Sequence, residues 1–212
     1  MSAPEFNDEF YAKLAQLFSW RRDVRHFRSD PVAEETIAAL VREASHSPSV
    51  GYSQPWRFVN VTTPQRRDII IASFERANAD ALQGYSGDDA ARYANLKLAG
   101  LRDAPVHLAV FCDTATETGK GLGRRTMPET LSYSVTMAIY TFWLAARARG
   151  VGAGWVSILE PDVVTTALDV PPSWQLIAYL CVGYPREEHD SPELRRAGWE
   201  SADERSTTVY ER

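Results

Sequence analysis

The sequence predicts an α+β fold, with helices and a sheet packed in layers within one domain spanning residues 1–212. A globule of this length buries roughly 70% of its unfolded surface without needing disulfides or metals. Hydrophobic residues make up 44% of the chain and charged residues 24%, which is ordinary for a globular protein. Apolar stripes at helical spacing and apolar runs of strand length follow one another without the βαβ alternation of a doubly wound fold.

Helices are predicted where apolar residues recur every three or four positions behind a capping residue. Asn7 or Asp8 caps the first helix, Pro31 opens the second and Pro64 opens the third. A break at residues 84–89 precedes a helix with a polar face. The predicted helices cover residues 7–20, 33–45, 64–82, 90–104, 126–149 and 161–168.

Strands are predicted from short apolar runs. Residues 106–112 are apolar almost throughout, which indicates a central strand buried on both faces. Residues 47–56 hold two prolines, one glycine and three serines and therefore form a loop. The predicted strands cover residues 57–62, 106–112, 154–159 and 175–184.

The helix over residues 126–149 has an unusual composition. Thr126 to Glu129 form a capping-box pattern with Pro128 in the first turn, and Gly150 follows the last turn. Its side chains are apolar almost all round, which indicates a helix buried on several sides.

Charge and cysteine content exclude several classes of protein. The net charge of −5 argues against partners such as nucleic acid or a membrane surface. The N-terminus is acidic and has no apolar core of a signal peptide, and no run of 18 apolar residues is present. Cys112 and Cys181 lie in apolar runs, as buried thiols of a cytoplasmic protein do.

Common catalytic motifs are missing from the sequence. It contains no phosphate-binding loop, no G-x-S-x-G, no H-E-x-x-H and no C-x-x-C. The four histidines lack metal-ligand spacing, so no metal is expected and they are interpreted as structural or surface residues. The glycines at 119, 121 and 123 lack the context of a dinucleotide fingerprint and are interpreted as a flexible loop.

Three arginines lie close together after the first helix. Arg21, Arg22 and Arg25 are three and four residues apart, so one helical turn brings them together. The guanidinium group suits phosphate oxygens, so the cluster is either an anion site or a solvated basic face. The small residues and backbone amides of residues 47–56 favour a flat ligand that carries a phosphate.

The Arg-Arg-Asp-Val-Arg motif at residues 21–25 and the Ser-Pro-Ser-Val-Gly-Tyr-Ser-Gln-Pro-Trp motif at residues 47–56 resemble the FMN-binding nitroreductase superfamily. Asp23 stands where most members carry serine, and this departure resembles the flavin destructase branch. The resemblance covers about residues 10–200. Further matches are Gly-Leu-Gly-Arg (121–124), Thr-Met-Pro-Glu-Thr (126–130), Leu-Ala-Ala-Arg-Ala (144–148), Gly-Trp-Val-Ser-Ile-Leu (154–159), Ala-Tyr-Leu-Cys (178–181), Gly-Tyr-Pro (183–185) and Gly-Trp (198–199).

The resemblance implies a nitroreductase-like fold, with a mixed or antiparallel sheet flanked by helices, in an intertwined homodimer with flavin sites at its interface. It implies that reduced FMN is a substrate, which molecular oxygen (O2) fragments to 5,6-dimethylbenzimidazole and erythrose 4-phosphate. A separate flavin reductase could supply the reduced FMN. Two alternatives stay open: a nitroreductase or flavin reductase that uses NAD(P)H, and a flavin-binding protein without catalysis.

The resemblance also implies roles for individual residues. Arg21, Arg22, Arg25 and the late Arg196 would hold the phosphate. Asp23 would accept a proton near the ribityl chain, and Ser157 would hydrogen-bond the flavin. The other residues implied to contact the flavin are Ser49, Tyr52, Trp155 and Val156. A competing interpretation stays open for three of these residues. Asp23 would then be a mere counter-ion, Ser157 a strand hydroxyl and Arg196 a surface arginine.

Two segments stand apart from the core elements. Residues 84–99 are expected from the resemblance to form a lid over the flavin. The alternative interpretation is an exposed helical hairpin without that role. Nearly half of residues 186–212 are charged, which indicates an arm wrapped over a surface or, at its end, a frayed tail.

Overall fold

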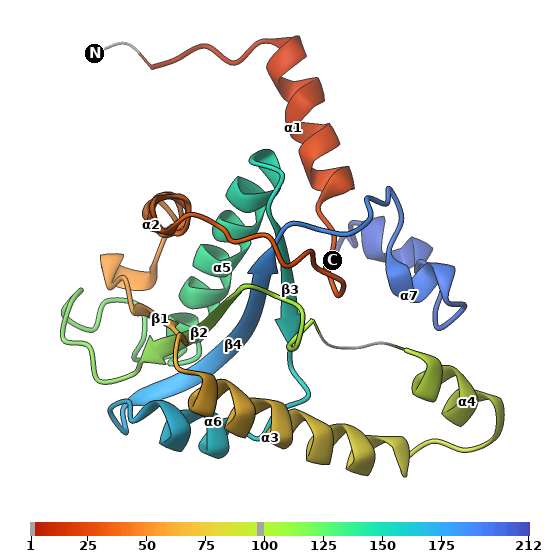
Figure 1. Cartoon of the computed structure of the whole chain (residues 1–212). Coiled ribbons are helices and arrows are strands. Elements are labelled where there is room, and N and C mark those ends of the chain that lie inside the picture. The colour runs from red at the N-terminus through yellow and green to blue at the C-terminus, as the bar shows by residue number, and fades with distance from the viewer. Residues whose placement is uncertain (1–2, 97–99) are drawn as a thin grey trace.

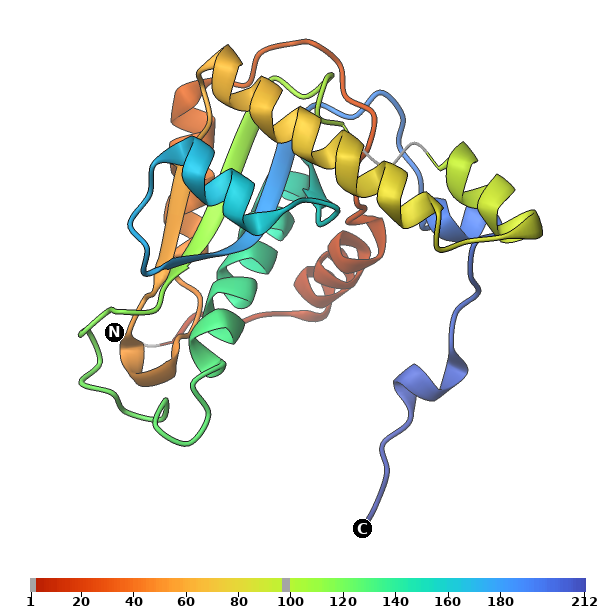
Figure 2. The ribbon, with the colours of Figure 1, turned by 90° about the horizontal axis from the view of Figure 1, so that it is seen from below.

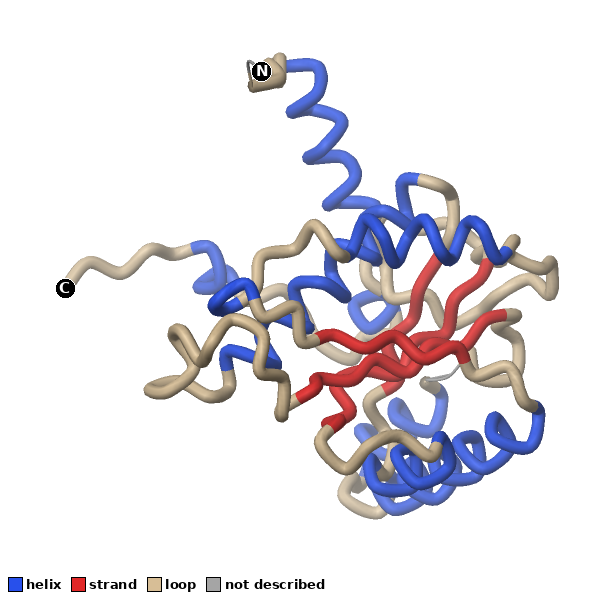
Figure 3. The backbone as a smooth tube through the Cα atoms, turned by 90° about the vertical axis from the view of Figure 1, so that its left-hand side faces the viewer, coloured by secondary structure: helices blue, strands red, loops and turns tan. Residues whose placement is uncertain are grey.

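The computed structural model describes residues 3–96 and 100–212. Within these residues a four-stranded sheet of order β1-β2-β4-β3 lies between two layers of helices (Figure 3). Every neighbouring pair of strands is antiparallel, so the predicted α+β class is confirmed and the sheet is antiparallel. The strands are β1 (Trp56–Asn60), β2 (Val106–Asp113), β3 (Gly152–Val156) and β4 (Trp174–Gly183).

The helices match most of the predicted segments. The arrangement is shown in Figures 1 and 2, where α3 and α6 lie side by side on one face of the sheet and α5 lies on the other. Asn7 caps α1 by accepting a hydrogen bond from the Phe10 backbone amide at 2.9 Å. The helices are α1 (Asp8–Trp20), α2 (Glu34–Ala44), α3 (Pro64–Leu82), α4 (Gly87–Asn95), α5 (Thr130–Ala148), α6 (Pro161–Leu168) and α7 (Glu193–Arg196), with short 3₁₀ turns η1 (Val50–Tyr52) and η2 (Glu204–Thr207).

The sheet has a hydrophobic core on each face. On β2, Leu108 and Val110 pack with α2 and α5, while Ala109 and Phe111 pack with α3 and α6. Successive strand residues point to opposite faces, so a strand buried on both sides must be apolar throughout. This confirms the central position predicted for residues 106–112. No helix among residues 3–96 and 100–212 is both long and apolar enough to cross a membrane.

The predicted start of α5 is wrong. The helix begins at Thr130, and Glu129 occupies the cap position without a side-chain capping bond. Met127 precedes Pro128, and the ring of a proline disfavours helical geometry in the residue before it. Met127 therefore belongs to a turn, in which its carbonyl accepts the Thr130 hydroxyl at 2.6 Å.

The boundaries of α4 also differ from the prediction. The helix covers Gly87–Asn95, so it begins before residue 90 and ends well before residue 104. Asp88 and Asp89 lie in its first turn, where acidic side chains stabilise the N-terminal end of a helix. Residues 100–104 form a turn closed by the Gly100 carbonyl. Residues 97–99, the end of the predicted lid, lie outside the described residues.

The burial of α5 is incomplete within one chain. Leu131, Val135 and Phe142 are buried against the sheet. Tyr133, Met137 and Tyr140 remain 53%, 40% and 42% exposed, and their spacing places them on one face of the helix. α1 contacts α5, projects from the body (Figure 1), and each of its residues is exposed or half-buried. This face of α5 is therefore uncovered within one chain, and its burial by a second copy of the chain stays a prediction.

A buried histidine lies on the α3–α6 side of the sheet. His107 is 1% exposed, and its Nδ1 is 2.9 Å from the Tyr179 hydroxyl. Burial, and then the positive charge of Arg67, lower the pKa of His107 to about 4. The folded chain therefore holds a neutral histidine that an unfolded chain would protonate near pH 6.5.

We expect His107 to weaken the fold as the pH falls. Because the pKa of His107 is lowered in the folded state, its contribution to the free energy of unfolding is fully present above about pH 6.5. This contribution is lost progressively as the pH falls toward 4. Urea unfolding should show a loss of about 2 kcal/mol between pH 7 and pH 5 from this group. His107→Gln should flatten that dependence, whereas His46→Gln, at an exposed site, should keep it. An unchanged pH dependence in His107→Gln would contradict the assignment.

Candidate active site

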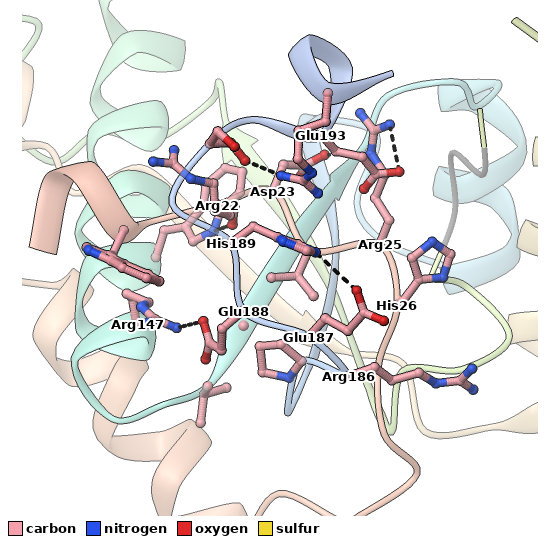
Figure 4. Close-up of a pocket in the computed structure, with 18 residues that line it drawn as sticks. Arg22, Asp23, Arg25, His26, Arg147, Arg186, Glu187, Glu188, His189 and Glu193 are labelled. Atoms are coloured by element: carbon pink, nitrogen blue, oxygen red, sulfur yellow. Dashed lines mark hydrogen bonds and ion pairs between the residues drawn. The ribbon is translucent and has the colours of Figure 1, made fainter. Parts of the chain in front are cut away.

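A cavity of about 530 Å³ opens beside the start of β3, between the segment after α1 and the segment after β4 (Figure 4). Arg22 to His26 line it from the first segment, and Pro185 to His189 from the second. α5 contributes Trp143 and Arg147. The cavity is therefore built from three parts of the chain that are distant in sequence, residues 20–26, 143–152 and 185–196.

The segment after α1 is fixed by contacts to β3 and α5. The Val24 backbone amide donates to the Ala153 carbonyl at 3.1 Å, and the Trp143 indole donates to the Arg22 carbonyl at 3.1 Å. Gly154 makes the crossing possible, because a Cβ at this position would lie 2.0 Å from the Val24 carbonyl oxygen. The close passage of the Val24 backbone therefore requires a glycine at this position of the Gly-Trp-Val-Ser motif.

This crossing places the Asp23 carboxylate at the cavity. Its Oδ1 accepts the Trp155 backbone amide at 2.8 Å, and its Oδ2 accepts Arg25 Nε at 3.2 Å. The Asp23 side chain is 34% exposed, so it is oriented by the protein while still open to a ligand. A carboxylate held in this way can accept a proton from a bound molecule.

Five arginines line the cavity together with Asp23. Arg22, Arg25 and Arg196 are among the residues expected from the sequence, and Arg147 and Arg186 join them from the last turn of α5 and the segment after β4. Burial, and then the charges of Arg21, Arg196 and Arg147, lower the pKa of Arg22. Such crowding of cations disfavours further positive charge and attracts an anion.

The residues after β4 partner these arginines. Arg22 Nη2 donates to the Asp190 carbonyl at 2.7 Å, and Arg147 pairs with Glu188. Arg196 donates to the Ser191 carbonyl.

Several guanidinium nitrogens keep unused hydrogen-bonding capacity. Arg21 Nε, Arg22 Nε and Arg25 Nη1 are buried and have no hydrogen-bond partner among the described residues. Leaving a buried charged donor unpaired is costly, so the site favours a ligand that supplies acceptor oxygens. A phosphate monoester has such oxygens, so these residues fit the phosphate group of a flavin mononucleotide.

Arg21 itself faces α5. Its guanidinium lies over the rings of Trp143 and Tyr140, with 5.0 Å and 5.9 Å to the ring centroids. The structure thus places Arg21 beside the cavity wall, and its expected role toward phosphate stays a prediction.

The predicted residues of β3 point in different directions. The Trp155 ring lies 6.5 Å from the Trp143 ring, on the α5 side. The Val156 side chain is buried in the core on the α3–α6 side. Ser157 follows the strand and is exposed.

Ser49 and Tyr52 lie apart from the arginines. They belong to the loop around η1, which Figure 1 shows across the sheet from α7. The Ser49 hydroxyl accepts the Gln54 backbone amide at 3.1 Å, and the Tyr52 side chain is exposed. One chain therefore does not bring these two residues to the cavity.

The hairpin that carries α4 is attached to the C-terminal arm. The rings of Tyr85 and Tyr93 stack at 4.8 Å, and the Trp199 ring meets Tyr85 edge-on at 5.4 Å. The arm thus packs on the chain as far as Trp199, whereas the residues beyond it extend away from the body (Figure 2). Whether residues 84–99 act as a lid stays a prediction.

Sequence reasoning gave no role to Arg147, Glu188 or Glu193. Arg147 lies within a motif that matches the family, and it is a basic residue at the end of an otherwise apolar helix. The contrast between this basic residue and the apolar helix before it could have marked Arg147 as a candidate site residue. Glu188 and Glu193 gave none, because both stand in a segment where nearly half the residues are charged.

Comparison with known proteins agrees with the fold and the motifs. The nitroreductase family model matches residues 18–184, so the chain belongs to the nitroreductase family. Among curated proteins, the chain is 60% identical over 202 residues to the 5,6-dimethylbenzimidazole synthase of Rhodospirillum rubrum, covering 94% of this chain and 95% of that protein. It is 46% identical over 199 residues to a protein of the same name from Rhodobacter capsulatus, with 94% and 95% covered. These relatives are enzymes, and the chain is a member of their family.

Solved structures show the same fold at lower identity. Oxidised iodotyrosine deiodinase, bound to FMN and 3-iodo-L-tyrosine, aligns with a TM-score of 0.70 and 23% identity over 83% of this chain and 91% of that chain. A nitroreductase family protein of Clostridium difficile 630 aligns with a TM-score of 0.67 and 18% identity, with 93% and 97% covered. At these identities the likeness establishes the fold alone.

Proposed function

We propose that this enzyme fragments reduced FMN with molecular oxygen to 5,6-dimethylbenzimidazole and erythrose 4-phosphate. The observation that carries the proposal is the Asp23 carboxylate, fixed by Trp155 and Arg25 inside an arginine-lined cavity. The name of the relatives supports the product. An enzyme that keeps its flavin needs the arginines but not this carboxylate.

In this proposal the arginines bind the phosphate end of the substrate. Arg22, Arg25 and Arg196 supply charge and donors from the cavity wall, and the unpaired Nε of Arg22 and Nη1 of Arg25 turn to the phosphate oxygens. Arg21 adds positive charge from outside the cavity wall, where its guanidinium lies over the Trp143 ring. Binding the phosphate here leaves the rest of the flavin beside β3.

Asp23 and Ser157 act on the reacting part of the substrate. When bound, reduced FMN supplies the electrons and oxygen is the oxidant. Asp23 accepts a proton near the ribityl chain, because its carboxylate is oriented on Trp155 and remains partly open. Ser157, exposed after β3, donates a hydrogen bond toward the flavin ring, with Trp155 and Val156 preceding it in the strand.

The complete site requires a homodimer. Ser49 and Tyr52 belong to the loop around η1 and do not line the arginine cavity of their own chain, so in this proposal they reach a flavin from a second copy of the chain. The uncovered stripe of Tyr133, Met137 and Tyr140 on α5 supports such an interface. A separate flavin reductase would supply the reduced FMN.

A product assay tests the proposal. Purified protein is mixed with chemically reduced FMN, air is admitted, and 5,6-dimethylbenzimidazole is sought by chromatography and mass spectrometry. Product that requires protein, reduced FMN and oxygen together supports the proposal. If FMN returns intact in its oxidised form, the proposal is overturned, and NAD(P)H turnover with a nitroaromatic acceptor then separates a reductase from a flavin-binding protein.

Arg25→Ala is expected to weaken FMN binding. The change removes a donor with an unused buried nitrogen, and a charge-assisted hydrogen bond contributes roughly 1.5–3 kcal/mol, or about tenfold to a hundredfold in affinity. Quenching of flavin fluorescence measures the dissociation constant for oxidised FMN. Arg28→Ala is the control, since Arg28 is exposed and pairs with Asp30. Equal affinity of Arg25→Ala and the wild type would refute the phosphate role.

A further inference from the structure

Arg25 lies between two carboxylates. Its Nε donates to Asp23 Oδ2 at 3.2 Å, and its Nη1 is 3.9 Å from Glu193 Oε1. The Arg25 side chain is only 11% exposed, so this guanidinium interacts with both acids in a partly desolvated place. Figure 4 shows Arg25 and Glu193 on the same side of the cavity as Asp23.

Glu193 acts on Arg25 through charge alone. The 3.9 Å separation is too long for a hydrogen bond, and Arg25 Nη1 has no hydrogen-bond partner among the described residues. Glu193 opens α7 directly after Pro192, which fixes its backbone near the cavity. Its side chain is 27% exposed, so its charge is only partly screened by water.

We infer that Glu193 is a positioning residue for the proposed reaction, because it shares the Arg25 guanidinium with Asp23. By attracting Arg25, Glu193 limits how strongly Arg25 holds the Asp23 carboxylate. The same negative charge opposes the phosphate that the arginines bind. Glu193 thereby lowers the affinity for the substrate while it leaves the Asp23 carboxylate less tightly paired and more available to the substrate. The catalytic half of this inference rests on the proposed reaction, and the binding half rests on the proposed phosphate site alone.

Removing the charge of Glu193 should change binding and turnover in opposite senses. In Glu193→Gln, oxidised FMN should bind roughly threefold to tenfold more tightly, because one repulsive charge beside the phosphate site is gone. Product formation at saturating reduced FMN should fall roughly tenfold, because Arg25 then pairs with Asp23 alone and holds its carboxylate away from the substrate. A residue that merely supported α7 would weaken binding as well as turnover.

Asp30→Asn is the matched control. Asp30 is exposed, pairs with Arg28 and does not line the cavity. Neutralising it changes the total charge equally and should alter FMN affinity less than twofold. Glu193→Ala provides a second test, because it removes the same charge without leaving an amide, and it should move both quantities in the same senses as Glu193→Gln. Thermal unfolding of each variant verifies that the fold is retained.

The two measurements separate this inference from the proposed function. If FMN binds Glu193→Gln no more tightly than the wild type, the inference is overturned even if the wild type makes 5,6-dimethylbenzimidazole. If affinity rises but turnover stays at the wild-type rate, the positioning role is overturned. If the wild type makes no product, the proposed function and the catalytic role fail together, and tighter binding then supports only the effect of Glu193 on the anion site.

Discussion

Asp23→Asn is expected to abolish fragmentation of reduced FMN while oxidised FMN still binds. Asparagine keeps an oxygen that can accept the Trp155 backbone amide, so the segment after α1 stays on β3. It loses the negative charge that accepts a proton, and loss of a general base typically costs roughly 10²–10⁴-fold in rate. Formation of 5,6-dimethylbenzimidazole in air and quenching of flavin fluorescence measure the two properties separately.

Asp30→Asn is the control for this change. Asp30 belongs to an exposed pair with Arg28 outside the cavity, so its neutralisation should leave both the product yield and FMN affinity near wild type. Product formation by Asp23→Asn at the wild-type rate would show that Asp23 is only a counter-ion for Arg25.

Gly154→Ala is expected to disrupt the site from within the fold. The added Cβ would lie 2.0 Å from the Val24 carbonyl oxygen, a backbone atom that can move only with its whole segment. The Val24 to Ala153 hydrogen bond and the contact between Asp23 and Trp155 would be lost together. Overpacking of this kind costs about 1–3 kcal/mol or more, so urea unfolding should show a lower free energy of unfolding.

The two variants are distinguished by FMN binding. Gly154→Ala should lose both binding and fragmentation, because Arg22 and Arg25 move with Val24, whereas Asp23→Asn should lose fragmentation alone. Gly84→Ala provides a control outside the site, where the nearest atom to the added Cβ is the Ala81 carbonyl at 3.3 Å. If Gly154→Ala matched the wild type in stability and FMN affinity, the crossing of Val24 over β3 would not be what fixes the site.

Local sequence patterns predicted the elements well where one residue type decides the geometry. Pro64 opens α3 and the predicted helix ends at Leu82, as the structure has it. The start of α5 was misplaced, because the effect of Pro128 on Met127 outweighs the capping pattern around them. Composition alone could not say what covers the apolar face of α5, because it records that a side chain is apolar but not what packs against it.

The sequence indicated the cavity residues that are neighbours in sequence, and the family resemblance added the distant Arg196. The Asp23 and arginine motif is local, so spacing and family resemblance both indicated it. Arg147 and Glu193 reach the same cavity from α5 and α7, and only tertiary packing brings these elements to Arg22 and Arg25. The glycine at 154 was noted within a motif, but its physical reason, the close passage of Val24, requires the structure.

The exposed N-terminal helix has a thermodynamic consequence. An isolated helix of 13 residues is marginally stable in water, and α1 has that length and packs on α5. A second copy of the chain that covered α1 would make ordering of the N-terminus a bimolecular event governed by mass action. Protein concentration would then regulate the helicity of this chain, as ligand concentration regulates the occupancy of a receptor.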